Sequence, residues 1–195
     1  MPLAASSPRL DNGERLLAGD IRALRKARGL KLAEIALKLG RSVGWVSQVE
    51  RGLSMPSLED LRALAVLFGV PVSLFFGHDV PEERERGVVV RGAQRRSLGT
   101  SESGLVEELL SPDLGGSFEM LRSVFAPGAE LKTENERPTE EAGYVVSGIF
   151  EIEIAGVWHR LTAGDSFRFE HKPHRWRNPG REPAVVIWVV SPPVY

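Results

Sequence analysis

Residues 40–52 read GRSVGWVSQVERG, and this stretch decides the fold of the N-terminal third of the chain. It predicts a short helix from Val43 to about Glu50, because Ser42 is a good N-cap and glycines stand on both sides. Three valines at three-residue spacing form one apolar face of this helix: Val43, Val46 and Val49. The side chains on the opposite face are small and polar, so this face of the helix can fit into a narrow groove.

The flanking sequence also has a helical period. Apolar residues recur at helical spacing before Gly29, between Leu32 and Leu39, and from Leu58 to Phe68, where Ser57 is the expected N-cap. Pro71 and the apolar cluster at 74–76 close the unit. We therefore expect a compact five-helix domain over residues 14–77.

The tight connection at residues 40–42 gives two of these helices the spacing of a helix-turn-helix. A second helix with small outward side chains can lie in a major groove about 12 Å wide. Residues 14–53 also carry nine basic against four acidic residues, although the whole chain has a net charge of −1. This local surplus favours a polyanionic partner.

Several runs resemble the phage-repressor (Cro/C1, xenobiotic-response-element) helix-turn-helix family: Ile21-Arg22-x-Leu24-Arg25, Leu32-Ala33-Glu34-Ile35-Ala36, Val46-Ser47-Gln48-Val49-Glu50-Arg51-Gly52 and Pro56-Ser57-Leu58-x-x-Leu61-x-x-Leu64-Ala65. The resemblance implies that the helix from Val43 to Glu50 is the recognition helix. It places Gly44, Trp45 and Gln48 at base edges. The complete set of expected DNA-binding residues is Lys31, Arg41, Ser42, Gly44, Trp45, Ser47, Gln48 and Arg51.

Alternative roles stay open for some of these residues. Glu50 and Arg51 can serve an internal salt bridge that holds the turn, and Trp45 can pack against the protein instead of DNA. Lys31-Leu32 stands where the family usually shows Thr-Gln, so Lys31 would replace the phosphate contact of that glutamine.

After His78 the hydrophobic period changes from 3.6 to 2. Residues 78–104 are expected to form a linker and a leading strand. Strands are expected at 88–90, 105–110, 118–125, 144–147, 150–154, 158–161, 166–169, 174–177 and 185–190. Residues 150–154 alternate strictly, which is typical of a strand with one wet face, and Ser147-Gly148 and Ala155-Gly156 are expected hairpin turns. The fold class is therefore α+β, an all-α domain followed by an all-β sandwich or small barrel.

Residues 105–192 resemble the cupin superfamily, a jelly-roll barrel. Glu141 and Gly148 fit the first cupin motif, and His174 and Asn178 fit the second. A helix-turn-helix followed by this barrel is similar to the single-cupin branch of these regulators. The resemblance implies a metal site of two histidines, one glutamate and a later histidine, but Asn135 and Arg137 stand where the first two histidines are expected.

We therefore expect no metal and no other cofactor. The residues expected to bind a small polar ligand are Arg137, Glu141, Tyr144 and His174. An Arg–carboxylate–His cluster in an apolar barrel favours a molecule with an anionic or amide group.

The leading hypothesis is a sequence-specific DNA-binding regulator, expected to be a repressor, in which the barrel dimerises and senses a small molecule. One helix-turn-helix contacts one half-site, so a homodimer on a two-fold operator is expected. The alternative is a metal-dependent enzyme, since the same domain pair occurs in an iron-dependent epoxidase of phosphonate antibiotic biosynthesis. A third hypothesis is an adaptor that binds protein. The chain has no Cys and no apolar stretch of about 20 residues, so a cytoplasmic protein that is not bound to membranes is expected.

Overall fold

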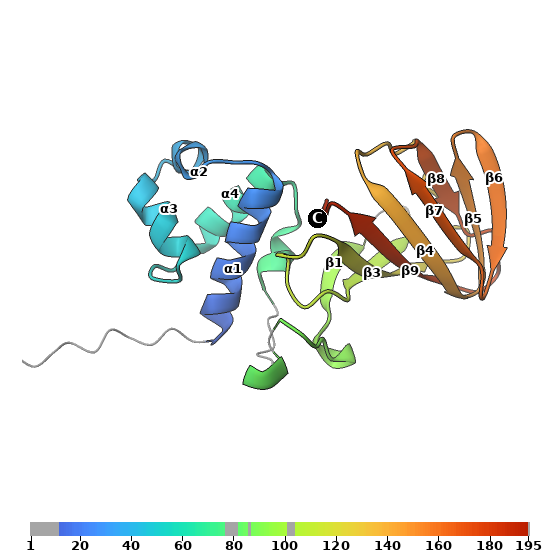
Figure 1. Ribbon diagram of the computed structural model, residues 1–195, viewed down its shortest axis with the longest axis horizontal. Coiled ribbons are helices and arrows are strands. Elements are labelled where there is room, and N and C mark those ends of the chain that lie inside the picture. The colour runs from blue at the N-terminus through green and yellow to red at the C-terminus, as the bar shows by residue number, and fades with distance from the viewer. Residues whose placement is uncertain (1–11, 77–81, 86, 101–103, 195) are drawn as a thin grey trace, which may run out of the picture.

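The computed structural model describes residues 12–76, 82–85, 87–100 and 104–194, which form a helical lobe and a strand-rich lobe (Figure 1). The helical lobe contains α1 (Asn12–Ala27), α2 (Leu32–Leu39), α3 (Val43–Glu50), α4 (Leu58–Phe68) and the 3₁₀ helix η1 (Val72–Phe75). Two short 3₁₀ helices, η2 (Glu83–Glu85) and η3 (Gly92–Gln94), precede the strands. The predicted α+β class is confirmed.

The helical lobe departs from the predicted five-helix unit in its last element. Its described residues form four α-helices, and the segment after Pro71 forms a single 3₁₀ turn in which the amide of Leu74 donates to the carbonyl of Pro71 at 3.0 Å. Four residues are too few for an α-helix, and i to i+3 bonding satisfies them locally. Val43 is also 47% exposed, so Val46 and Val49 alone carry the buried face of α3.

The strand-rich lobe consists of two antiparallel sheets. Its strands are β1 (Arg96–Thr100), β2 (Leu105–Leu109), β3 (Glu119–Phe125), β4 (Glu140–Ser147), β5 (Ile149–Ile154), β6 (Val157–Thr162), β7 (Ser166–Glu170), β8 (His174–Arg177) and β9 (Ala184–Ser191). The larger sheet has the order β1-β2-β3-β9-β4-β7, and the smaller one has the order β6-β5-β8. The expected sandwich is therefore present.

The strand expected at residues 88–90 is not formed. The amides of Val88 and Val89 both donate to the carbonyl of Glu85, at 3.0 and 2.9 Å, so they belong to a turn and leave no donors for a strand ladder. The first strand begins at Arg96 and pairs with β2.

The two expected hairpin turns have different outcomes. Ala155-Gly156 is confirmed, because Ile154 pairs directly with Val157 across it. Ser147-Gly148 is not a hairpin turn: β4 pairs with β7 and β9, whereas β5 pairs with β6 and β8. This dipeptide therefore carries the chain from one sheet to the other. Gly148 has φ 82°, and an added Cβ would come within 2.7 Å of the Cα of Ala184.

The strict alternation in β5 does not give a wet face. Glu151 and Glu153 are buried beneath arginines of the neighbouring strands, which pair with their carboxylates. Arg177 Nε lies 2.6 Å from Glu151 Oε2, and the guanidinium group of Arg177 lies over the ring of Trp158. Polar residues at alternate positions therefore mark an ion-paired face here, because the long arginine side chains cover it.

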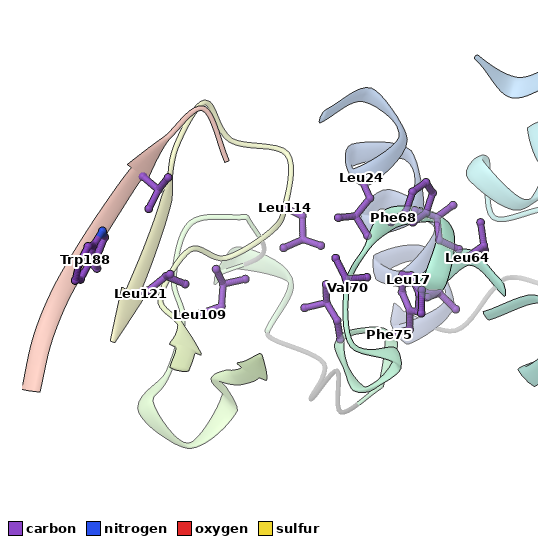
Figure 2. Close-up of a cluster of buried hydrophobic side chains, with 14 of the residues drawn as sticks. Leu17, Leu24, Leu64, Phe68, Val70, Phe75, Leu109, Leu114, Leu121 and Trp188 are labelled. Atoms are coloured by element: carbon purple, nitrogen blue, oxygen red, sulfur yellow. The ribbon is translucent and has the colours of Figure 1, made fainter. Parts of the chain in front are cut away.

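The two lobes share one hydrophobic core. Figure 2 shows Leu114, from the connection between β2 and β3, between Leu24 and Val70 of the helical lobe and Leu109 and Leu121 of the barrel. A buried ion pair joins the lobes as well, since Arg96 Nη1 lies 2.5 Å from Asp20 Oδ2. The helical lobe is therefore packed on the barrel and not merely tethered to it.

Candidate nucleic-acid interface and barrel cavity

The rotation of α3 is fixed by its buried side. Val46 and Val49 are each 2% exposed, so the face that carries Gly44 and Gln48 points to solvent. Ser42 caps the helix, as expected, by accepting a hydrogen bond from the amide of Trp45 at 3.1 Å. The preceding helix ends at Gly40 with φ 62°, a left-handed conformation that favours glycine and makes the tight turn possible.

An ion pair anchors the end of α3 to α1. Arg25 Nε and Nη2 donate to the two carboxylate oxygens of Glu50 at 2.6 and 3.0 Å, and Arg25 Nη1 donates to the carbonyl of Leu30 at 3.0 Å. The internal role left open for Glu50 is therefore the one it has, with Arg25 as its partner. Arg51 is exposed, and its Nε donates to the carbonyl of Ser47 at 3.2 Å.

Arg41 has a structural role besides its expected DNA contact. Its Nε and Nη2 donate to the carboxylate of Asp60 at 3.0 and 3.1 Å, and its guanidinium lies 5.1 Å from the centre of the Trp45 ring. Burial raises the pKa of Asp60, but the bonds from Arg41 and Ser57 outweigh burial and hold this pKa below its ordinary value. Asp60 in turn caps α4 together with Ser57.

The expected DNA-binding residues lie together at the start of α2, in the turn and along α3. Lys31 is exposed, and its amide donates to Glu34 Oε2 at 2.6 Å, so the carboxylate takes up a free amide at the start of α2. Trp45 and Ser47 are half-buried, and Trp45 packs against the core of the lobe. The exposed members are Lys31, Arg41, Ser42, Gly44, Gln48 and Arg51.

A cavity of about 660 Å³ is lined by inward-facing residues of the barrel and, on one side, by Arg28, Gly69, Pro71 and Leu74 of the helical lobe. Three of the four residues expected to bind a ligand line it: Arg137, Glu141 and His174. Tyr144 is not brought together with them. It is 50% exposed on β4, because Glu141, Gly143 and Val145 alternate on the buried face and Tyr144 lies on the opposite face.

Glu141 is already hydrogen-bonded within the barrel. Its Oε1 accepts from the hydroxyl of Thr139 at 2.8 Å, and its Oε2 accepts from the indole Nε1 of Trp188 at 2.8 Å. His174 Nε2 lies 3.9 Å from Oε2, beyond hydrogen-bond distance. Burial lowers the pKa of His174 below its ordinary value, so this ring is neutral at pH 7. Arg137 is exposed, and its Nε donates to Asn135 Oδ1 at 3.3 Å.

These donors do not fit the metal site that the cupin resemblance implies. Both carboxylate oxygens of Glu141 are occupied by protein donors, and an amide and a guanidinium stand where two histidines are required. Within the described part of the chain, no cluster of three or more His, Asp or Glu side chains is arranged to hold a metal ion.

Three further carboxyl groups line the cavity, those of Glu107 on β2, Glu119 on β3 and the exposed Glu134, and sequence reasoning missed all three. The alternation of β3 contains the signal, because Glu119 has the same parity as the inward Leu121 and Phe125. Burial raises the pKa of Glu107 above its ordinary value and that of Glu119 to about 7. The inner wall is therefore more acidic than the expected ligand residues suggested.

The C-terminal tail links this wall to the helices. The amide of Val194 donates to Glu119 Oε1 at 3.2 Å, and the carbonyl of Val194 accepts from Arg28 Nη2 at 3.0 Å. Arg28 Nε donates to the carbonyl of Phe68, the last residue of α4, at 2.8 Å. In Figure 1 the chain end after β9 accordingly lies between the two lobes.

Comparisons with known proteins match both lobes. Residues 16–75 match the helix-turn-helix domain family, and residues 121–190 match the cupin domain family. The chain is 28% identical over 175 residues to the HTH-type transcriptional regulator SutR of Escherichia coli, which covers 89% of this chain and 93% of SutR. It is 33% identical over 136 residues to the HTH-type transcriptional regulator DdrOP3 of Deinococcus deserti, which covers 69% of this chain and 90% of that relative.

Among solved structures, hydroxypropylphosphonic acid epoxidase from S. wedmorenis aligns with 93% of this chain and 100% of its own. The identity is 16% and the TM-score is 0.47. No helix in the described segments is long and apolar enough to cross a bilayer.

Proposed function

Because the chain belongs to the helix-turn-helix transcriptional regulators and carries a C-terminal cupin domain, we propose that it binds a two-fold DNA operator as a homodimer. The observation that carries the proposal is the exposed face of α3, held outward by Val46, Val49 and the Arg25–Glu50 ion pair. A rigidly seated helix with small and polar outward residues can enter the major groove.

The residues in this interface have two kinds of role. Gln48 and Gly44 face the bases, and Gln48 can pair with adenine through two hydrogen bonds. Trp45 packs on a thymine methyl or a sugar with its exposed edge. The remaining residues contact phosphates and position the helix: Lys31, Arg41, Ser42, Ser47 and Arg51.

Two substitutions separate reading from positioning on an operator selected from random DNA. Gln48→Ala should weaken binding to the operator by about 1–3 kcal/mol and leave non-specific binding nearly unchanged. Lys31→Ala should weaken binding to all sequences and make the salt dependence shallower by about one unit. Lys132→Ala removes the same charge from an exposed barrel position and should change neither quantity. Identical behaviour of the Gln48 and Lys31 variants would overturn the assignment of roles.

The homodimer is supported by the size of one reading domain. A single module buries about 600–1,000 Å² on DNA, so useful affinity needs two copies. The full chain should therefore sediment as a dimer at micromolar concentration. A monomer at that concentration, with or without the operator, would contradict the dimer.

The barrel is proposed to sense a small molecule in its cavity, through Arg137, Glu141 and His174. The protein would then act as a ligand-responsive repressor in the cytoplasm. This is supported by the position of the cavity, whose lining includes Arg28 and Leu74 of the helical lobe. A reporter gene under the selected operator should be derepressed when the gene for this protein is deleted, and reduced expression in the deletion strain would contradict repression.

We propose no enzymatic role for the barrel. The epoxidase-like triad needs a histidine four residues before Glu141, and Arg137 occupies that place. Metal analysis of the purified protein tests this directly. Stoichiometric Fe, Mn or Zn that survives dialysis and is lost in Glu141→Ala would restore the enzyme hypothesis.

A further inference from the structure

One carboxylate oxygen in the barrel is buried without a hydrogen-bond partner. Glu119 is 2% exposed, and among the described residues no donor reaches its Oε2. Its Oε1 accepts only the 3.2 Å bond from the amide of Val194. An unsatisfied buried carboxylate is unfavourable by itself, and such groups in native structures usually have a partner. Because Glu119 lines the cavity, a bound molecule can supply the missing donor.

The surrounding wall determines the charge of that donor. Glu119 on β3 and Glu141 on β4 both pair with Val190 of β9, so these two carboxylates lie in one row on either side of β9. Of the described residues that line the cavity, four carry carboxyl groups and two carry guanidinium groups. The carboxyl groups are Glu107, Glu119, Glu134 and Glu141, and the guanidinium groups are Arg28 and Arg137.

Neither guanidinium donates a hydrogen bond to Oε2 of Glu119, although the charge of Arg137 offsets part of the effect of burial on the pKa of Glu119. Two nitrogens of Arg28 are bonded to the carbonyls of Phe68 and Val194, and Arg137 is exposed and bonded to Asn135. An anion near Oε2 would be repelled by the neighbouring carboxylates. A metal ion is disfavoured too, since the described carboxylates and histidines do not converge on one point.

We propose that Glu119 binds the ammonium group of a small organic effector, whose apolar part lies against Leu121, Phe125 and Trp188 of the same cavity. This rests on the proposed function, in which the cavity is the sensor site, and it replaces the anionic or amide ligand expected from Arg137. Hydrogen bonds between an ammonium and a carboxylate are about twice as strong as neutral ones, so Glu119 sets the ligand class.

The same carboxyl group connects the ligand to the DNA-binding lobe. Glu119 accepts a hydrogen bond from the amide of Val194, and the carbonyl of Val194 accepts one from Arg28. Arg28 also donates to the carbonyl of Phe68 at the end of α4. An ammonium on Oε2 changes how strongly Oε1 accepts from Val194, and so alters the bonding of the tail to the helices. Binding of the amine and binding of the operator are therefore coupled, and the coupling is reciprocal.

The test uses three probes of equal length on the full-length protein: n-hexylamine, 1-hexanol and hexanoate, each titrated by calorimetry at pH 7.5. Hexylamine should bind, and the neutral and anionic probes should bind at least about tenfold more weakly. Glu119→Gln should weaken hexylamine binding by about tenfold or more. Glu170→Gln is the matched control, since Glu170 is exposed on β7, and it should leave the affinity unchanged.

A second variant guards against misfolding. Glu119→Met replaces the unpaired carboxylate with an apolar side chain of similar length, so it should fold at least as well by thermal unfolding while losing hexylamine binding. Equal hexylamine affinity in wild type and both Glu119 variants would overturn the proposal. Preference for hexanoate or hexanol, binding of none of the probes, or displacement of hexylamine by Mg²⁺ or Zn²⁺ would also overturn it.

A gel shift on the same samples separates this proposal from the proposed function. Protein that binds its operator but not hexylamine refutes only the ligand class, whereas protein that fails to bind any operator refutes the regulator role. In wild type, hexylamine should change operator affinity by about fivefold or more, and in Glu119→Met it should not.

Discussion

The ion pair between Arg25 and Glu50 determines how firmly the recognition helix is held, and removing one partner tests this. The side chains of Arg25 and Glu50 are 16% and 6% exposed, and the Arg25 guanidinium donates three hydrogen bonds. Arg25→Met leaves the carboxylate of Glu50 in its buried place without its cation. Breaking a buried pair in this way costs about 3–5 kcal/mol, a large part of a typical domain stability of about 5–15 kcal/mol.

Urea denaturation measures this cost. Helix content is followed by circular dichroism, and Trp45, the one tryptophan before residue 158, adds a local fluorescence signal. The double variant Arg25→Met/Glu50→Leu should recover much of the loss, because an apolar pair needs no cation. Arg168→Met is the matched surface control: the side chains of Arg168 and Glu140 are 69% and 45% exposed, so the urea midpoint should stay nearly unchanged.

Binding to DNA completes this test. Under conditions in which the variant is still folded, Arg25→Met should weaken operator binding because α3 loses its anchor to α1. Gln48→Ala should weaken operator binding without any change in urea stability. The reasoning is refuted if Arg25→Met costs less than about 1 kcal/mol, or if the double variant is no more stable than the single one.

Substitution of two glycines with the same backbone angle separates strain from crowding. Gly148 and Gly156 both have φ 82°, but an added Cβ meets backbone at 2.7 Å only at Gly148 and has nothing within 4 Å at Gly156. Thermal unfolding should therefore show a loss of about 1–2 kcal/mol for Gly156→Ala and a clearly larger one for Gly148→Ala. Burial raises the pKa of Glu119 from 4.5 to about 7, so the folded state keeps a proton that the unfolded chain releases. The stability linked to that proton is fully present below pH 4.5 and is lost as pH rises through 7, a loss of about 3 kcal/mol. Glu119→Gln should abolish this dependence of the free energy of unfolding on pH, as measured by urea denaturation. Asp60 has the opposite sign: its pKa lies below the ordinary 3.8, so its contribution is present above pH 3.8 and lost as pH falls. Arg41→Ala should therefore destabilise the protein more at pH 7 than at pH 3, and an equal loss at both would show that Asp60 is not held by Arg41.

Local sequence patterns were sufficient to predict the recognition helix of the helical lobe. The valine spacing and the Ser42 cap predicted α3 and its outward face, because helix rotation depends on residues within two turns. The bond from Arg41 to Asp60 spans 19 residues, and no local pattern indicates it. The family resemblance therefore predicted a DNA contact for Arg41, which stays a prediction, but nothing in the sequence indicated that Arg41 holds the residue that caps α4.

In the barrel, the limit was topology. A glycine after a small residue indicates a tight backbone turn but not which strands pair on either side of it. The sequence therefore did not distinguish Ser147-Gly148 from the true hairpin turn at Ala155-Gly156. Glu119 and Glu141 are 22 positions apart, and they share a row only because β9 lies between β3 and β4. That strand order is a property of the closed sandwich, so the acidic wall could not be predicted from the motifs.

The contact between the lobes gives the barrel a physical means of acting on DNA binding. Leu114 packs into the helical core, Asp20 pairs with Arg96, and Arg28 bonds to the tail that Glu119 holds. Each single hydrogen bond contributes only about 1 kcal/mol, so the loss of one bond in the tail can shift operator affinity by about fivefold. Typical coupling between two sites is about 1–3 kcal/mol, and this arrangement falls within that range without any large domain movement. The proposed ligand at Glu119 would therefore act on operator affinity through Val194 and Arg28, because Arg28 bonds both the tail and the end of α4.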